Sequence, residues 1–134
     1  MKEEIQYLVL QKEYADYRDK IMDFYKPEYG DSFNEETMNN SAFIGLALTG
    51  ETVVGAGRVI SDLSRHAELV DLIVDPAWRK QGIGSELARR LVDKLKENKV
   101  RYIGLVKDPN YPWLKDFYTK LGFKPLPADS YFEM

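Results

Sequence analysis

The chain has 134 residues, 44% of them hydrophobic and 31% charged, and its formal net charge at pH 7 is −3. These values are typical of a soluble globular protein, and we expect residues 1–134 to form a single domain. The chain has no cysteine and one histidine, which excludes disulfides and a thiolate nucleophile and leads us to expect no metal site. The N-terminal apolar run is too short for a signal peptide or a membrane span, so we expect a cytoplasmic protein.

The first sixty residues predict alternating strands and helices. Residues 5–10 form a β-prone run, and the apolar residues between Tyr14 and Tyr25 recur at helical spacing up to Pro27, which we expect to end the helix. Residues 34–38 predict a short second helix. Residues 42–48 and 52–60 predict two strands joined by a hairpin turn. Two glycines, Gly55 and Gly57, would weaken the second strand unless a bulge or a close neighbour requires them.

A strand, a loop and a helix are predicted between residues 67 and 99. The apolar run 67–74 ends at Asp75-Pro76, and residues 85–99 have the pattern of an amphipathic helix. The loop between them includes Arg79, Lys80, Gln81, Gly82, Ile83, Gly84 and Ser85. The free amides and positive dipole end of a helix start attract phosphate, and glycine lets the anion approach the backbone closely. The loop therefore predicts an anion site. It lacks the third glycine of a dinucleotide fingerprint and the Gly-Lys-Ser/Thr of a Walker loop.

The last third of the chain predicts one more strand and one more helix. Residues 101–106 predict a strand parallel to residues 67–74, because a helix connects the two. Residues 108–112 contain two prolines and interrupt the chain. Residues 113–121 predict a helix that Gly122 ends, and residues 123–126 and 131–133 predict extended segments.

Two motifs resemble signatures of the GCN5-related N-acetyltransferase (GNAT) family. Arg79-x-x-Gly82-x-Gly84, after a strand that ends in Val-Asp-Pro, resembles the family's loop for the pyrophosphate of acyl-CoA, and the stretch 117–123 resembles its second signature. The resemblance spans roughly residues 41–126, and the stretches 58–62 and 68–71 are loosely similar to the arylalkylamine and serotonin-type branch. It implies an α/β fold with a mixed central sheet, helices on both faces and a parallel strand pair that splays apart.

The resemblance also implies the reaction and its residues. The expected activity is direct transfer of the acetyl group of acetyl-CoA to a small primary amine in a ternary complex. Pantetheine would pair with the backbone of Leu72, Ile73 and Val74, with the Val74 amide near the developing oxyanion, and Asn110 lies where the family often bonds the pantetheine arm. Tyr118 occupies the position of the acid that protonates the leaving thiolate, and a phenol is protonated at neutral pH.

The general base is left open among four residues. Glu68 is the first choice, because the family often uses a strand carboxylate at a comparable place. Asp71 is a second candidate, and period two predicts that it lies on the opposite face of the strand from Glu68. His66 and Asp108 complete the set.

Alternative functions follow from other features of the sequence. A protein or peptide N-acetyltransferase and a CoA-binding regulatory module without turnover would share the same motifs. Residues 79–101 hold eight basic and three acidic side chains, but the whole chain is acidic, so we expect a phosphorylated small ligand and neither nucleic acid nor a membrane as partner. Residues 1–40 hold ten acidic and five basic side chains, which favours a cationic amine as acceptor. Exposed strands near the C-terminus would permit a homodimer.

Overall fold

The computed structural model describes residues 4–12, 14–106, 114–127 and 133–134. Its elements in chain order are β1 (Gln6–Leu10), α1 (Arg18–Tyr29), the 3₁₀ turn η1 (Gly30–Ser32), α2 (Glu35–Asn39), β2 (Phe43–Thr49), β3 (Thr52–Ser61), β4 (His66–Val74), the 3₁₀ turn η2 (Pro76–Trp78), α3 (Ile83–Glu97), β5 (Tyr102–Gly104) and α4 (Leu114–Lys120). The strands form a five-stranded sheet in the order β1-β2-β3-β4-β5. Strands β1 to β4 pair antiparallel, and β5 pairs parallel to β4. The fold is thus the mixed α/β sheet that the sequence predicts.

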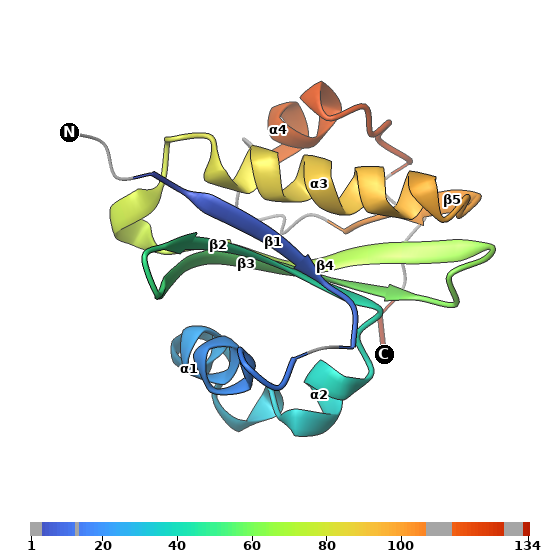
Figure 1. Ribbon diagram of the computed structural model, residues 1–134. Helices are drawn as coiled ribbons and strands as arrows, with labels where there is room; N and C mark the ends of the chain where they lie inside the picture. The colour runs from blue at the N-terminus through green and yellow to red at the C-terminus, as the bar shows by residue number, and fades with distance from the viewer. Residues whose placement is uncertain (1–3, 13, 107–113, 128–132) are drawn as a thin grey trace.

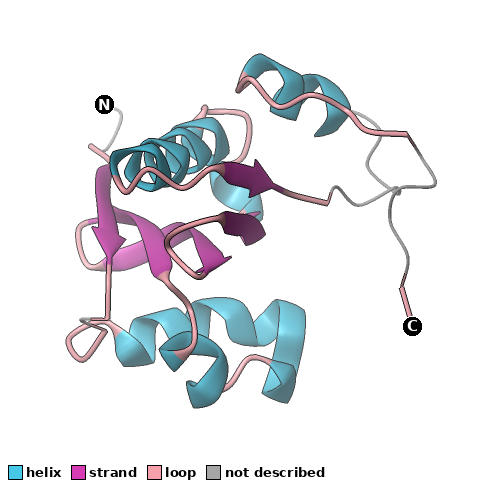
Figure 2. Ribbon diagram, turned by 90° about the vertical axis from the view of Figure 1, so that its right-hand side faces the viewer, coloured by secondary structure: helices cyan, strands magenta, loops and turns pink. Residues whose placement is uncertain are grey.

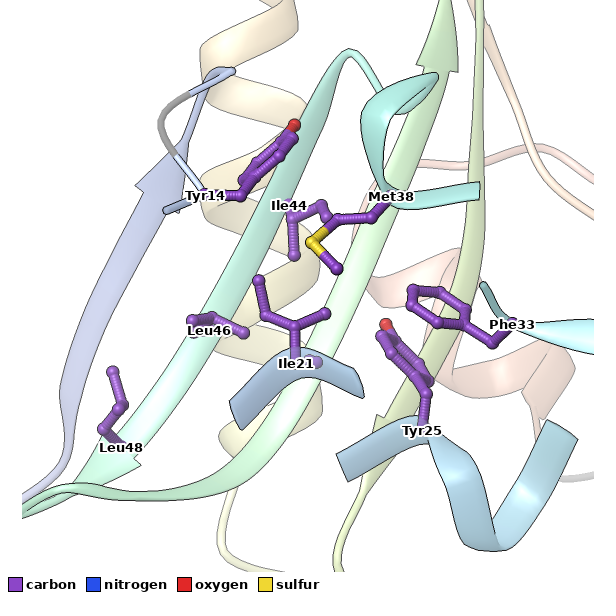
Figure 3. Close-up of a cluster of buried hydrophobic side chains, with 9 residues drawn as sticks. Tyr14, Ile21, Tyr25, Phe33, Met38, Ile44, Leu46 and Leu48 are labelled. Atoms are coloured by element: carbon purple, nitrogen blue, oxygen red, sulfur yellow. The ribbon is translucent and has the colours of Figure 1, made fainter. Parts of the chain in front are cut away.

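Helices cover both faces of the sheet. Figure 1 shows α1 and α2 against one face and α3 against the other, with α4 on the side of α3. The view in Figure 2 shows the same arrangement, with α4 beside α3 and far from α1 and α2. The cluster of buried side chains under α1 and α2 (Figure 3) consists of Tyr14, Ile21, Tyr25, Phe33, Met38, Ile44, Leu46, Leu48 and Ala56. Two further clusters join the other face to the apolar stripe of α3.

Helix α1 differs from its prediction at both ends. It begins at Arg18, after a turn in which the amide of Tyr17 bonds to the carbonyl of Tyr14, and it continues through Pro27 to Tyr29. The expectation that Pro27 ends the helix is wrong. Pro27 is exposed, so water can reach the carbonyl that lacks a proline N–H partner. The helix ends instead at Gly30, which has a φ of 55° and an amide that bonds to the carbonyl of Lys26.

Helix α3 lies very close to β2 and β3. A Cβ atom added to Gly45, Gly55 or Gly57 would lie 3.1–3.2 Å from a side chain of α3, and the one at Gly57 would lie 2.9 Å from Leu72. The strand register also shifts between Ala56 and Arg58. Both conditions under which glycine is expected inside a strand, a close neighbour and a bulge, are therefore met.

Strand β4 contains a bulge at Asp71. Val70 pairs with Arg58 and Ile73 with Ala56, so two residues of β4, Asp71 and Leu72, lie opposite one residue of β3. The φ angle of Asp71 is 53°. The extra residue breaks the two-residue period, and the Asp71 carboxylate bonds to Arg58, which pairs with Ile44 on the face covered by α1.

The bulge changes where the two strand carboxylates lie. Glu68 is opposite Ile60, which is two residues from Arg58 and therefore on the same face. The expectation that Glu68 and Asp71 lie on opposite faces is wrong, because it assumed a regular strand.

Strands β4 and β5 pair over three residues only. Residues 66–68 of β4 pair with residues 102–104 of β5, and in the described part of the chain Leu69–Val74 have no β5 partner. The parallel pair therefore separates toward the C-terminal end of β4, and β5 is shorter than the predicted strand 101–106. Helix α4 agrees with its prediction from Leu114 to Lys120, and Trp113 lies outside the described residues. Residues 123–126, predicted to be extended, belong to no strand of the sheet, and the predicted extended residues 131–132 are not described. Among the helices described, none has the length and apolar composition needed to cross a membrane.

Candidate active site

The start of α3 presents a row of open amides. Gly82 is the N-cap, with a φ of 81°, and no side chain caps the helix. Its carbonyl accepts a hydrogen bond of 3.0 Å from the amide of Glu86. The amides of Ile83, Gly84 and Ser85 bond to no other residue that the structure describes. A Cβ added to Gly82 would meet no atom within 4 Å. The loop thus combines unpaired donors, a helix dipole and open space, which is the chemistry of an anion site.

The basic side chains near the loop divide into two groups. Lys80 is exposed, and Arg79 is exposed and donates from Nε to the carbonyl oxygen of Val74 across 3.0 Å. Arg89 and Arg90 bond instead to Glu86 on the same helix, and hydrogen bonds from Arg89 are the main reason why the pKa of Glu86 is lowered. The excess of positive charge in residues 79–101 is therefore partly neutralised on α3. Arg79 and Lys80, which precede the open amides, form no ion pair with any side chain that the structure describes.

Beyond its short pairing with β5, the edge of β4 has no strand partner among the residues that the structure describes. The amide of Asp75 bonds to the carbonyl of Val54 in β3 across 2.8 Å. Backbone groups of a strand alternate between its two neighbours, so those of Ile73 face β3 and those of Val74 face away from it, toward the gap between β4 and β5. The carbonyl of Ile73 lies near Gly55 of β3, in agreement with this alternation.

Helix α4 connects the two motifs in space. A Cβ on Gly84 would lie 3.5 Å from Val74 and 3.6 Å from the ring of Phe117. Tyr118 follows Phe117, is half-buried, and its ring centroid lies 4.9 Å from that of Phe117 and 6.1 Å from that of Phe123. Burial raises the pKa of the Tyr118 phenol above its usual value of 10.0. The predicted acid therefore lies on a helix that reaches the start of α3, next to the residue of α3 that adjoins the end of β4.

Glu68 lies at the last paired step of β4 and β5, where the gap begins. It is opposite Gly104 on β5, and its carboxylate occupies the space that a side chain at position 104 would need, since a Cβ there would be 3.0 Å from Oε1. The Nε2 atom of His66 is 2.8 Å from the same oxygen. The rings of His66 and Tyr102 meet edge to face, with centroids 4.7 Å apart.

Asp71 is already engaged by its neighbours. Its Oδ2 accepts a hydrogen bond of 2.5 Å from Nε of Arg58, and its backbone carbonyl accepts one of 2.7 Å from the hydroxyl of Tyr25. Burial, and then the Asp71 carboxylate, raise the pKa of Tyr29. The contacts of Arg58 and Tyr25 with Asp71 could not be expected from the sequence, because they depend on the bulge and on strand register. Of the other predicted site residues, Asn110 and Asp108 lie outside the described residues.

A groove lies on the α1 side of the sheet near the end of β4. Its volume is about 500 Å³, and it is lined by α1, the β2–β3 turn and the residues that follow β4. Its charged side chains are the carboxylates of Asp23, Glu28, Glu51 and Asp75 and the cations of Lys20 and Arg79.

Comparison with known proteins identifies acetyltransferases as relatives of this chain. A solved structure of a GNAT family acetyltransferase from Streptococcus pneumoniae has 26% sequence identity and a TM-score of 0.81, over 98% of this chain and 96% of that one. GCN5-related N-acetyltransferase 2, chloroplastic, of Arabidopsis thaliana is 35% identical over 75 residues, which are 56% of this chain and 28% of the relative. An aminoglycoside acetyltransferase from an uncultured soil metagenomic sample, solved with sisomicin, shares the fold, with a TM-score of 0.70 over 97% of this chain and 96% of that one at 18% identity.

The family assignment follows from the extent of the match. The chain spans less than a third of the length of the Arabidopsis relative. The family model is matched over residues 7–123, from β1 to the residue after Gly122, and includes the loop at the start of α3 and helix α4. The chain belongs to the acetyltransferase (GNAT) family.

Proposed function

We propose that the protein transfers the acetyl group of acetyl-CoA to a small primary amine, directly and within a ternary complex. One observation carries this proposal. The open amides of Ile83–Ser85 adjoin the end of β4, and Phe117, the neighbour of Tyr118 on α4, lies beside Gly84. A phosphate site, a strand edge with no partner among the described residues, and the helix that carries a proton donor thus lie around the start of α3.

The residues of the site fit coenzyme A. The amides of Ile83, Gly84 and Ser85, with Arg79 and Lys80 beside them, would hold the pyrophosphate, and Gln81 and Gly82 complete the loop. The edge of β4 has no strand partner beyond Glu68 among the described residues, although the Val74 carbonyl accepts from Arg79, and a pantetheine arm has two amides that could bond to the edge. The alternation along β4 favours Val74 and Leu72 over Ile73 for these bonds, since Ile73 faces β3. The thioester of acetyl-CoA would supply the activated acetyl group.

Glu68 is the proposed general base. An ammonium has no lone pair, so the acceptor must lose a proton before it attacks, directly or through a water. Glu68 is partly exposed at the start of the gap between β4 and β5, and no Arg or Lys pairs with it among the described residues. Asp71, in contrast, is held by a hydrogen bond from Arg58, so its carboxylate is already engaged within the protein.

The position of the base also bears on the oxyanion donor. The sequence predicts this donor at Val74. Glu68 is opposite Ile60 and Val74 is opposite Gly55, so at about 3.3 Å per residue along β3 their backbones are roughly 17 Å apart. Leu72 is roughly 10 Å from Glu68 on the same measure. We therefore propose the Leu72 amide as the donor to the carbonyl oxygen of the acetyl group.

Tyr118 is the proposed acid for the leaving thiolate. Its phenol is half-buried, and the direction of its pKa shift keeps it protonated at neutral pH, as a donor must be. The acceptor would approach from the face of the sheet where Glu68 lies. Two large side chains on that face, Ile60 and Tyr102, are 47% and 48% exposed on the strands that flank Glu68. They favour an amine with an apolar or aromatic body.

The decisive experiment is a screen of primary amines with acetyl-CoA, followed by release of free thiol. Amine-dependent release that Gly82→Val abolishes would support the proposal. Thiol release with peptides but with none of the amines would indicate a protein acetyltransferase, and coenzyme A binding without release in any condition would indicate a regulatory module. A single domain over residues 1–134, a cytoplasmic location and a homodimer stay predictions.

A further inference from the structure

We propose that Tyr25, Arg58 and Asp71 form a clamp that fixes the bulge of β4 and so aims the amide of Leu72 at the acetyl carbonyl oxygen. These three are positioning residues, since none of them needs to touch a reacting atom. The inference rests on the proposed function. It adds that the acceptor-side helix α1 controls the geometry of the donor on β4.

The first observation is the backbone of Asp71. Its φ of 53° lies in the left-handed region, which residues other than glycine rarely adopt, although Asp and Asn tolerate it better than most. Such a conformation is strained and persists only where the surroundings hold it. Something in the fold must therefore hold the backbone at Asp71.

The second observation is the hydroxyl of Tyr25, which bonds to the carbonyl oxygen of that same residue across 2.7 Å. Tyr25 is fully buried, and its ring stacks on Phe33 with centroids 4.4 Å apart. Burial is the main reason why the pKa of Tyr25 is well above 10.0, so the hydroxyl keeps the proton that it donates. A rigid helix thus holds one side of the bulge.

The third observation is the ion pair on the side chain of Asp71. Nε of Arg58 donates to Oδ2 across 2.5 Å, and one terminal nitrogen of Arg58 donates to Oγ of Ser41 across 3.3 Å. The side chains of Arg58 and Asp71 are 14% and 22% exposed. The guanidinium also lies over the ring of Phe33, 5.9 Å from its centroid. Backbone and side chain of Asp71 are therefore each held by a different element.

The bulge matters because it sets the register of the residues after it. Residues 70 and 73 of β4 pair with residues 58 and 56 of β3, one residue more than a regular ladder allows. A strand has a period of two, so loss of the extra residue would turn each following residue to the other side. The Leu72 amide would then face β3 instead of the gap. The clamp is what makes this amide available.

The kinetic test compares two buried tyrosines. Tyr25→Phe removes the hydroxyl at the bulge, and Tyr14→Phe removes a matched hydroxyl, which donates to the carbonyl of Ser41 across 3.1 Å. Loss of one oxyanion donor typically lowers kcat by about 10²–10³, and misalignment of such a donor should lower it by about tenfold or more. We expect this fall in Tyr25→Phe with an unchanged KM for acetyl-CoA, and wild-type kcat in Tyr14→Phe.

A second test needs no turnover. Amide hydrogen exchange of the β4 residues 70–74 should be faster in ligand-free Tyr25→Phe than in ligand-free Tyr14→Phe. Three substitutions of Asp71 separate geometry from charge. Asparagine tolerates positive φ and can accept a hydrogen bond from Arg58, so Asp71→Asn should retain more activity and show slower exchange than Asp71→Ala. Asp71→Glu keeps the charge but favours a negative φ. It should therefore resemble Asp71→Ala in both measurements.

The outcomes separate this inference from the proposed function. If the wild-type protein releases no thiol with any acceptor, the proposed function fails, and the exchange experiment still decides whether the clamp holds the bulge. If the wild-type protein is active and Tyr25→Phe matches Tyr14→Phe in both kcat and exchange, the clamp is refuted. Retention of activity in Asp71→Glu, with loss in Asp71→Asn, would also refute it, because Asp71 would then act as a base.

Discussion

Nε2 of His66 lies 2.8 Å from Oε1 of Glu68, and both residues belong to β4 where it is paired with β5. The carboxylate extends over Gly104, into space that any larger residue would fill. The imidazole packs edge to face on Tyr102. The only histidine of the chain is thus a direct neighbour of the proposed base and is the alternative candidate for that role.

Glu68→Gln tests which of the two is the base. General base catalysis contributes about 10²–10⁴ to the rate, so we expect kcat to fall by about a hundredfold or more in Glu68→Gln. His66→Gln should retain most of kcat, because a glutamine can still donate a hydrogen bond to Glu68. Steady-state rates over a range of pH would measure both. A larger loss in His66→Gln than in Glu68→Gln would assign the base to His66.

Gly82→Val tests the anion site. A ligand that binds only the native state raises its melting temperature, so coenzyme A should stabilise the wild-type protein. Valine strains a φ of 81° and brings bulk into open space at the helix start, so the shift should disappear. Gly50→Val is the matched control, since Gly50 has a φ of 57° and equally open surroundings in the β2–β3 turn. It should lower the melting temperature of the free protein to a similar degree and keep the shift with coenzyme A. An unchanged midpoint of the wild-type protein at millimolar coenzyme A would remove the basis of the assignment.

Tyr118→Phe tests the leaving-group acid. Only the phenol proton is lost, so kcat should fall by about a hundredfold, with little change in acetyl-CoA affinity. The pKa of Tyr118 is raised, so its protonated form persists above pH 10 and the wild-type rate should show no loss from this group between pH 7 and about pH 10. Tyr7→Phe is the control, because Tyr7 lies on β1, at the edge of the sheet opposite β5. This variant should have the wild-type rate. A wild-type rate for Tyr118→Phe, measured where chemistry limits turnover, would make Tyr118 a packing residue.

The strands, α3 and the loop before it could be predicted because their signals are local. Helical spacing identified the stripe of α3, and the break at Asp75-Pro76 marked the end of β4. The separation of β4 from β5 was expected only through the family resemblance, because no local pattern encodes where two distant strands part.

The bulge at Asp71 could not be predicted, and the base assignment depended on it. Aspartate gives no clear signal for a φ of 53°, and the contact with Arg58 requires the register between β3 and β4. Pro27 was misjudged for a related reason. Helix propensity disfavours proline inside a helix, but burial of Tyr25 on one side of Pro27 and a glycine cap after it extend α1 to Tyr29.

The charge of the groove beside α1 provides the last prediction. Four carboxylates and two cations line it, and none of the six forms an ion pair with another described side chain. From the sequence, the acidic side chains of residues 1–40 are expected to act together in favouring a cationic acceptor. Glu35, however, is paired with Arg18 on the surface, whereas Asp23 and Glu28 line the groove on the same face of the sheet as Glu68. The field that attracts a cationic acceptor should therefore come from the groove.

The double variant Asp23→Asn/Glu28→Gln should lower kcat/KM for a cationic amine at low salt, because unpaired carboxylates of one sign concentrate positively charged ligands. The effect should fade as salt rises, since exposed charges are screened over about 10 Å at 0.1 M. Asp31→Asn/Glu36→Gln is the matched control, with the same change in charge at exposed positions outside the groove, and it should leave kcat/KM unchanged. The measurement compares one amine with its carboxylated analogue at low and high salt. If the two double variants have equal effects, the preference for the cationic amine comes from net charge alone and not from the groove. If the wild-type protein prefers the carboxylated compound, the electrostatic argument is refuted, while the acetyltransferase family assignment stays intact.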